Sequence, residues 1–153
     1  HVLRLITDLV NHDYDKKQSQ TSIKNALEFA SKISRRKNVM FVISDFMDDN
    51  FWTEMKYLYF NHDVIGIQIY DLFEKEFPDL GLMKVHNSES NERVWIDTSN
   101  EKVRLDFSKD FSKRLNTFAQ RCKNIGFDLL QIGTNEDYIK ALTRFFKRRA
   151  KRT

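Results

Sequence analysis

The chain contains one unbroken apolar run, Val39 to Ile43, that ends abruptly at Ser44 and Asp45. A run this short, without alternation and rich in β-branched and aromatic side chains, predicts a strand buried on both faces. In an open parallel α/β sheet, ligands bind at the carboxyl ends of the strands. Ser44 and Asp45 are therefore the first candidate residues for any site that this domain forms.

Two further apolar runs, 64–70 and 127–132, predict strands of the same kind. Apolar residues at helical spacing predict helices at 1–11, 21–33, 51–61, 109–124 and 136–150. Thr21 is the expected N-cap of the second helix, and Thr134 or Asn135 that of the last. Strands that alternate with helices through short links should be parallel.

The segment between the second and third strands departs from this rhythm. Residues 71–81 form an acidic stretch with the only proline, which predicts a loop. Residues 82–86 and 93–97 alternate around a polar turn and predict a solvent-facing β-hairpin, with 103–105 as a candidate third piece. The expected fold is one α/β domain with three parallel strands and a hairpin insertion. Because residues 1–11 begin almost inside a helix, we expect 1–153 to be the C-terminal part of a longer protein.

The composition is that of a globular protein. Its 153 residues suit a single domain, and 41% hydrophobic with 31% charged residues argues against disorder. No apolar run approaches the roughly 20 residues of a membrane span, so no membrane association is expected. The single cysteine, Cys122, fits a reducing compartment, from which we expect a cytoplasmic protein. Cys122 falls on the apolar stripe of its helix and is expected in the core.

The net charge of +4 is concentrated in the tail. Residues 144–153 hold six of the 26 Lys and Arg and no acid, so the other 143 residues carry 20 basic against 22 acidic side chains. This distribution argues against a nucleic-acid-binding face across the domain. The tail could contact phosphate, but Phe145 and Phe146 more simply pin the last helix to the core with its cations in solvent. Nucleic acid is not the expected partner.

Carboxylates gather after the first two strands. Asp45, Asp48 and Asp49 could bind a hard cation, although Asp48 or Asp49 could instead cap the following helix. The acidic residues of 71–76 could serve as acid and base, but no neighbouring nucleophile or histidine supports that role. The four histidines show no zinc spacing, and phosphate-loop, dinucleotide-binding and nucleophile-elbow motifs are absent from the sequence. The sequence therefore favours a protein that is not an enzyme.

Several segments together resemble one family, the domain-of-unknown-function-58 family. They are T-S-I-K-N-A-L, R-R-K-N-V-M-F-V-I-S-D-F, H-D-V-I-G-I-Q-I-Y-D-L-F-E-K-E-F-P-D-L-G, V-W-I-D-T and D-Y-I-K-A-L-T-R-F-F-K-R-R. They fall in the family's order across nearly the whole chain. The resemblance implies a Rossmann-like, von Willebrand factor A-like three-layer sandwich, here truncated to its C-terminal portion. It also implies a protein partner, a MoxR-type AAA+ ATPase, beside which family members often occur.

The resemblance further implies a metal-ion-dependent adhesion site built from three loops that hold Mg²⁺. Thr21 matches the second loop and Asp45, next to Ser44, matches the third. The first loop, D-x-S-x-S, is absent from this sequence, and Gln20 and Phe46 stand where glycine is usual. Thr21, Ser44 and Asp45 are thus an incomplete site. We expect Mg²⁺ only in a full-length protein, with no tight binding by this chain.

The missing strands have a physical consequence. In doubly wound sheets of order 3-2-1-4-5-6, strand 39–44 would be the fourth, and its neighbour would be absent. An exposed apolar edge invites pairing with another chain, so we expect a homodimer through this edge.

The leading hypothesis is a non-enzymatic protein-interaction module of von Willebrand factor A type that partners a MoxR-type AAA+ ATPase. The alternative is a metal-dependent hydrolase that uses Asp45 and Asp71 at adjacent strand ends. A third hypothesis, nucleic-acid binding through residues 144–152, predicts steeply salt-dependent affinity.

Overall fold

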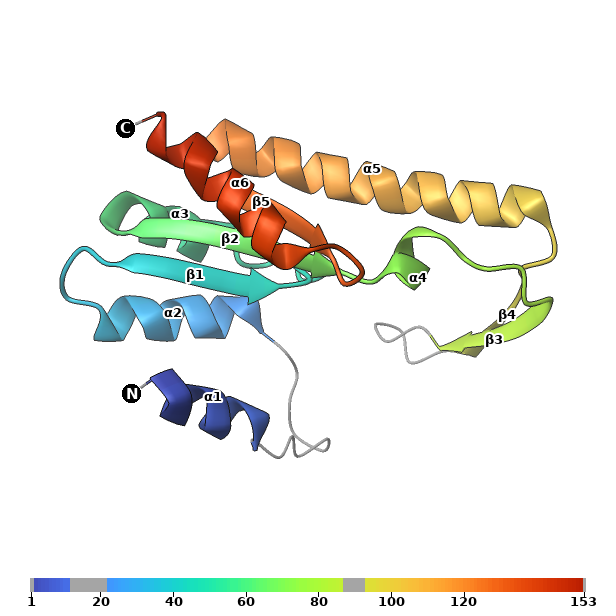
Figure 1. Cartoon of the computed structure of the whole chain (residues 1–153), viewed down its shortest axis with the longest axis horizontal. Coiled ribbons are helices and arrows are strands. Elements are labelled where there is room, and N and C mark those ends of the chain that lie inside the picture. Colours follow the sequence, from blue (N-terminus) through green and yellow to red (C-terminus); the bar gives the residue numbers. More distant parts are fainter. Residues whose placement is uncertain (1, 12–21, 87–92, 153) are drawn as a thin grey trace.

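A computed structural model describes residues 2–11, 22–86 and 93–152. Its centre is a parallel sheet in the order β1-β2-β5, with a separate antiparallel pair, β3 and β4 (Figure 1). The strands are β1 Val39–Ser44, β2 Asp63–Tyr70, β3 Leu82–His86, β4 Arg93–Asp97 and β5 Asp128–Gly133. The helices are α1 Val2–Val10, α2 Ile23–Ile33, α3 Trp52–Asn61, α4 Leu72–Lys75, α5 Glu101–Ile125 and α6 Tyr138–Ala150. The predicted mixed α/β class, with three parallel strands and a hairpin, is confirmed.

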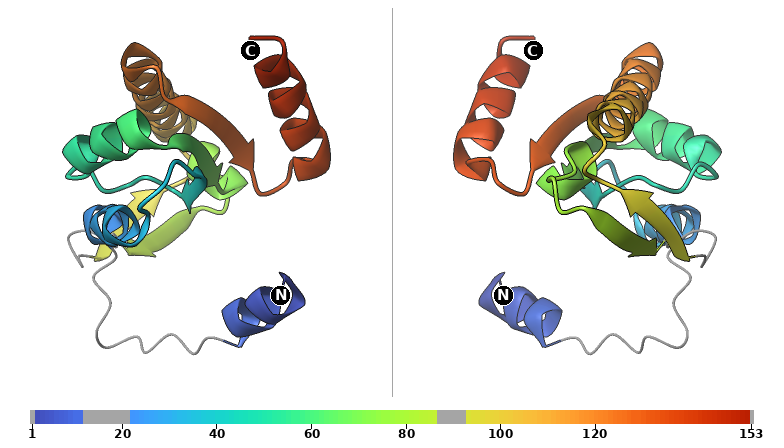
Figure 2. Two further views of the ribbon diagram at one scale, coloured as in Figure 1. Left: turned by 90° about the vertical axis from the view of Figure 1, so that its left-hand side faces the viewer. Right: turned by 90° about the vertical axis from the view of Figure 1, so that its right-hand side faces the viewer.

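Helices cover the two faces of the sheet unequally. Figure 2 shows α2, α3 and α5 on one side and α6 on the other. The larger core cluster joins α2, α3 and α5 to the sheet through buried residues such as Leu27, Leu58 and Cys122. The smaller cluster packs Phe145 of α6 against Ile65 of β2 and Leu130 of β5. Because α6 packs on β2 and β5, the same side of β1 is left without a covering helix.

The prediction that β1 is buried on both faces is wrong. Met40 and Val42 pack against the larger core, but Val39, Phe41 and Ile43 are each at least half exposed. Within the described residues β1 pairs only with β2, so it is an edge strand. An apolar run without alternation cannot reveal that one face of β1 is exposed. It shows that both faces are hydrophobic, but not which elements cover them.

Local capping corrects the predicted starts of two helices. Helix α5 begins at Glu101 and absorbs residues 103–105, because the Asn100 side chain accepts a hydrogen bond from the Lys102 amide. Helix α6 is capped by Asp137, and not by Thr134 or Asn135. The Lys140 amide, and to a lesser extent the Lys140 side chain, donate hydrogen bonds to the Asp137 carboxylate and hold its pKa below its usual value.

Two further capping assignments change the picture of the loops. Ser22 caps α2 by accepting from the Asn25 amide, whereas the expected cap, Thr21, lies outside the described residues. The stretch after β2, predicted as a loop, contains the short helix α4. Its capping box pairs the Asp71 carboxylate with the Phe73 amide and the Glu74 carboxylate with the Asp71 amide.

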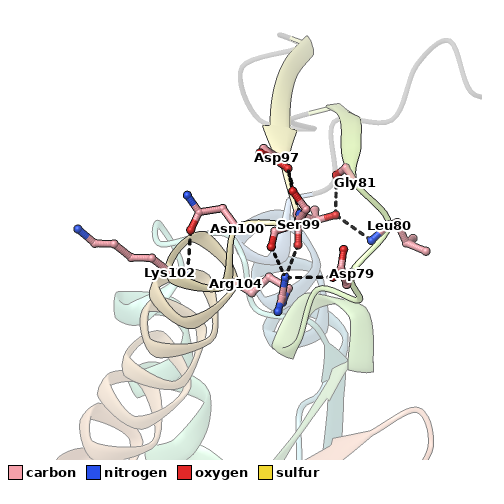
Figure 3. Close-up of polar contacts among 9 residues, drawn as sticks. Asp79, Leu80, Gly81, Asp97, Ser99, Asn100, Lys102 and Arg104 are labelled. Atoms are coloured by element: carbon pink, nitrogen blue, oxygen red, sulfur yellow. Dashed lines mark hydrogen bonds and ion pairs between the residues drawn. The ribbon is translucent and has the colours of Figure 1, made fainter.

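The hairpin β3–β4 is anchored to the start of α5 (Figure 3). Thr98 is fully buried; its hydroxyl accepts from the Leu80 amide at 3.0 Å and donates to the Gly81 carbonyl at 2.7 Å. Arg104 donates to the Thr98 carbonyl at 2.5 Å and lies 3.7 Å from the Asp79 carboxylate. The segment V-W-I-D-T, which contributes to the family resemblance, therefore ends in a buried structural threonine.

The basic tail is partly structural. Arg149 of α6 pairs with the carboxylate of Asp63 and, at 3.0 Å, with that of Asp128, which lie near the amino ends of β2 and β5. Phe145 is buried, as expected, but the expectation that the tail cations are all solvated is wrong for Arg149. The guanidinium bridges two carboxylates that would otherwise repel one another across adjacent strands.

Replacing Arg149 with alanine is expected to lower the free energy of unfolding by about 1–2 kcal/mol, since it leaves two partly buried carboxylates without their shared cation. The matched control, Arg148→Ala, removes the same charge from an exposed position of the same helix and should change stability by less than about 0.5 kcal/mol. Urea denaturation measures both. Equal effects of the two substitutions would show that the ion pairs contribute nothing specific.

Candidate functional site at the carboxyl end of the sheet

The structure brings Ser44 and Asp45 together where β1 ends. The Ser44 hydroxyl donates to Asp45 Oδ1 at 3.2 Å, and the Met47 amide donates to the same oxygen at 3.2 Å. The Phe46 amide donates to Ser44 Oγ at 3.1 Å. Asp45 is exposed, so its carboxylate is accessible while the loop backbone sets its orientation. Thr21, the third predicted ligand, lies outside the described residues.

The other candidate carboxylates have local roles. Asp48 Oδ1 accepts from the Asn50 amide at 2.8 Å, and α3 begins after Phe51 without a side-chain cap, so the predicted capping of α3 by Asp48 or Asp49 is wrong. Asp71, besides capping α4, accepts from the Thr134 hydroxyl at 3.2 Å. This bond links the carboxyl ends of β2 and β5.

The oxygens present do not make a complete site for Mg²⁺. Ser44 and Asp45 supply one hydroxyl and one carboxylate, whereas Mg²⁺ takes about six oxygen ligands in octahedral geometry. Asp45 Oδ1 already accepts two hydrogen bonds. In residues 2–11, 22–86 and 93–152, no group of three or more His, Cys, Asp or Glu could hold a metal ion. Ser44 and Asp45 alone would therefore leave most of the Mg²⁺ coordination positions to other ligands.

Phe46 has an unusual backbone. Its φ is 56°, the one positive φ among the described residues other than glycine, and its side chain is only 6% exposed. The ring packs on Phe118 of α5 at a centroid distance of 4.9 Å and on Phe51 at 5.7 Å. The left-handed region favours glycine because a Cβ is strained there. The chain thus adopts a glycine-type turn at this position and stabilises it by burying an aromatic side chain.

An open cleft of about 760 Å³ lies beside this loop. The Asp45–Asp49 loop and the end of β2 form one wall, and α5 forms the other. Carboxylates of Asp45 and Asp49 in the loop and of Glu74 in α4 line one side, whereas α5 contributes three cations and one carboxylate, that of Asp110. The α5 cations are Lys113, Arg114 and Arg121. The loop side is acidic, the α5 side is cationic on balance, and aromatic rings also line the cleft, which suits a polypeptide with both polar and apolar side chains.

Trp52 connects the aromatic cluster to the basic wall. The Arg121 guanidinium carbon lies 3.9 Å from the centroid of the Trp52 ring, within the range of a cation–π contact. Trp52 also stacks on Phe51 at 5.0 Å. Its indole Nε1 is buried and has no hydrogen-bond partner among the described residues. An exposed cation held over a rigid aromatic ring presents positive charge at a fixed place on the cleft wall.

A buried amide network, which the sequence analysis missed, holds the loop in place. Gln68 of β2 donates to the Asp45 carbonyl at 2.9 Å, and Gln131 of β5 donates to Gln68 Oε1 at 2.8 Å and to the Leu115 carbonyl at 3.1 Å. Ser44, Gln68 and Gln131 are register partners across the three strands. The available signal was a single glutamine inside each of two largely apolar runs, V-I-G-I-Q-I-Y and F-D-L-L-Q-I.

Cys122 is fully buried, as predicted. Burial raises the pKa of its thiol to about 12. Since the thiolate is the reactive form, this cysteine is a core side chain and not a nucleophile at neutral pH.

The family model described as "Protein of unknown function DUF58" matches residues 1–116. The chain belongs to this family. The match covers the elements from α1 through the first part of α5, and therefore includes Ser44, Asp45 and the loop that forms one wall of the cleft. The membership of this family predicted from the sequence is confirmed.

Mycobacterial proteins are similar to this member of the DUF58 family. "Uncharacterized protein MAV169" of Mycobacterium avium is 26% identical over 125 residues, which cover 81% of this chain and 73% of that protein. "Uncharacterized protein Rv1480" of Mycobacterium tuberculosis and "Uncharacterized protein Mb1516" of Mycobacterium bovis are each 25% identical over 123 residues, 78% of this chain and 38% of theirs. The chain thus spans well under half of these two relatives. No solved structure matches the chain significantly.

None of the helices in the described part of the chain is long and apolar enough to cross a membrane.

Proposed function

We propose that this DUF58 domain is a non-enzymatic protein-interaction module whose contact surface is the carboxyl end of the sheet. The observation that carries the proposal is the cleft between the Asp45–Asp49 loop and α5. Its walls combine exposed carboxylates, arginines and aromatic rings. Arg and Trp are the side chains most enriched among residues that dominate protein–protein binding energies.

The fold supports the proposal by analogy. A parallel sheet of order β1-β2-β5 with helices on both faces is compatible with a Rossmann-like architecture, and in such sheets ligands bind outside the carboxyl ends of the strands. In the von Willebrand factor A type that the resemblance implies, this end contacts other proteins through a metal-ion-dependent adhesion site. Ser44 and Asp45 would be an incomplete form of that site, and Mg²⁺ would bind tightly only with ligands from beyond this chain.

The partner that we propose is a MoxR-type AAA+ ATPase, by the family association. A partner surface that fits the cleft would present acidic side chains to Arg114 and Arg121 and apolar side chains to the partly buried ring of Phe107. The contact would be sensitive to ionic strength, since the cations of the α5 wall are exposed or only partly buried.

Amide hydrogen exchange with and without such an ATPase tests this surface. Slower exchange is expected in residues 45–51 and 110–121 on binding, while β3 and β4 should exchange as in the free protein. Protection confined to the hairpin would contradict the proposal. A parallel assay measures phosphoester hydrolysis by the protein in the presence of Mg²⁺, and no turnover is expected. Turnover by the wild type that is lost in both Asp45→Asn and Asp71→Asn would favour a hydrolase instead.

The open edge of β1 supports self-association as a second part of this proposal. The Asp63 amide donates to the Asn38 carbonyl, so alternate residues from Asn38 face β2, and the backbone groups of Val39, Phe41 and Ile43 face the open edge. Residues 39–44 include no charge, glycine or proline, the features that usually protect an edge.

Light scattering after size exclusion is expected to show a dimer. Ile43→Pro removes one edge amide and should give a monomer, whereas Ile43→Thr retains the amide and should stay dimeric. A wild-type monomer at tens of micromolar would contradict self-association through this edge.

A further inference from the structure

Among the described residues, two exposed apolar surfaces could bury one another: the outer face of a strand and the apolar side of a short helix. The first is the outer face of β1, with Val39, Phe41 and Ile43 exposed by 59%, 50% and 61%. The second is α1, whose side chains Val2, Leu3 and Ile6 are 70%, 80% and 51% exposed. We infer that α1 docks on the outer face of β1, beside α6. This inference goes beyond the proposed function, because it concerns a different face of the sheet.

Helix α1 needs a partner surface. It has nine residues, and isolated helices shorter than about 12–15 residues are marginal in water. Its sequence, V-L-R-L-I-T-D-L-V, places apolar residues on one broad side and Arg4, Thr7 and Asp8 on the other. Arg4 and Asp8 lie 3.9 Å apart along the polar side. An amphipathic helix this short is stabilised mainly by packing its apolar side.

The uncovered face has the size of one helix. A helix is about 10 Å wide and strands are about 4.8 Å apart, so one helix covers roughly two strands. Because α6 packs on β2 and β5, space for one more helix is left over β1. Nine helical residues extend about 13.5 Å, which fits within the roughly 20 Å of the six-residue strand β1. Phe146 of α6, whose ring lies 6.2 Å from that of Phe41, would form the side wall.

The tether permits this contact. Figure 2 shows α1 on the same side of the sheet as α6. The ten residues 12–21 join α1 to α2, and ten residues span at most about 33–36 Å. A tethered segment binds its own chain at an effective concentration of the millimolar order. The chain's own α1 is therefore the occupant that the geometry favours over the helix of a second copy. The docked helix would cover side chains of β1 and leave the backbone groups of its edge available.

Hydrogen exchange of the whole protein tests the docking. Amides of residues 2–10 are expected to exchange at least about tenfold more slowly than in an unstructured chain, at every protein concentration. Ile6→Asp and Phe41→Asp should each remove this protection. Phe60→Asp, at a more exposed apolar position on α3, should leave it intact. Exchange at the unstructured rate in the wild type, or protection that rises with protein concentration, would overturn the inference.

A cross-link provides a second readout in case Phe41→Asp does not fold. The native Cys122 is buried, so a bismaleimide will react only with introduced cysteines. The pair Ile6→Cys and Ile43→Cys is expected to cross-link within one chain at least about tenfold faster than the pair Ile6→Cys and Phe60→Cys. Equal rates for the two pairs would overturn the inference.

Discussion

Phe46→Ala is expected to lower the free energy of unfolding by about 3–5 kcal/mol, because it removes a buried ring from the centre of the aromatic cluster. Phe46 is 6% exposed and its ring contacts those of Phe51 and Phe118. Alanine loses this packing and keeps the strained left-handed backbone, with φ at 56°. Chemical denaturation followed by circular dichroism measures the loss.

Phe46→Gly separates strain from packing. Glycine loses the same ring but tolerates a positive φ, so it should be less destabilising than alanine by about 1 kcal/mol. Phe118 provides the matched control, since it belongs to the same cluster but lies inside α5. There the order should reverse, with glycine worse than alanine by about 1 kcal/mol. If alanine is the better replacement at both positions, the backbone of Phe46 does not have the conformation described.

Gly66→Ala is expected to cost about 2–3 kcal/mol, since it overpacks the centre of the sheet. A Cβ on Gly66 would lie 2.7 Å from the ring of Phe127 and 3.1 Å from the Leu129 side chain. Gly66 lies in the middle of β2, paired with a strand on each side, so its backbone cannot easily move. The ring of Phe127 is buried and cannot easily move either. Thermal and urea denaturation should both report the change.

A second substitution tests this mechanism. Phe127→Leu removes the ring edge that the new methyl group meets, so the double variant should lose less stability than the sum of the single variants by about 1 kcal/mol. Gly81→Ala is the control for glycine removal without a clash, because no atom lies within 4 Å of the added Cβ and only its φ of +72° opposes the change. Additive effects of Gly66→Ala and Phe127→Leu would rule out the steric explanation.

Most of the fold could be predicted from hydrophobic periodicity. Helices α1, α2, α3 and α6, the three parallel strands and the hairpin follow from the spacing of apolar residues, which reflects one buried side of each element. The edge position of β1 was also expected. The one-sided exposure of β1 was not, because it depends on which helices cover the sheet. The starts of α5 and α6 were predicted at the wrong residues, because Asn100 and Asp137 cap these helices.

The site could be located but not assembled from the sequence. Ser44 and Asp45 lie at the predicted strand end, since the end of an apolar run is visible locally. The Gln68–Gln131 contact joins residues 63 positions apart, and only the register of β2 and β5 shows that they meet. The basic wall of α5 was equally hidden, because Arg114 and Arg121 belong to a charged helix that gives no local sign of facing the Asp45 loop.

The affinity of the protein for a MoxR-type AAA+ ATPase, measured by isothermal titration calorimetry, tests the proposed contact surface most directly. Asp45→Ala should weaken binding at least about tenfold, the loss of roughly 1.4 kcal/mol expected for one interface carboxylate. The control, Asp106→Ala, removes the same charge from an exposed position of α5 outside the cleft and should leave the affinity within about twofold. Wild-type affinity in Asp45→Ala would contradict the account, as would equal weakening by both substitutions.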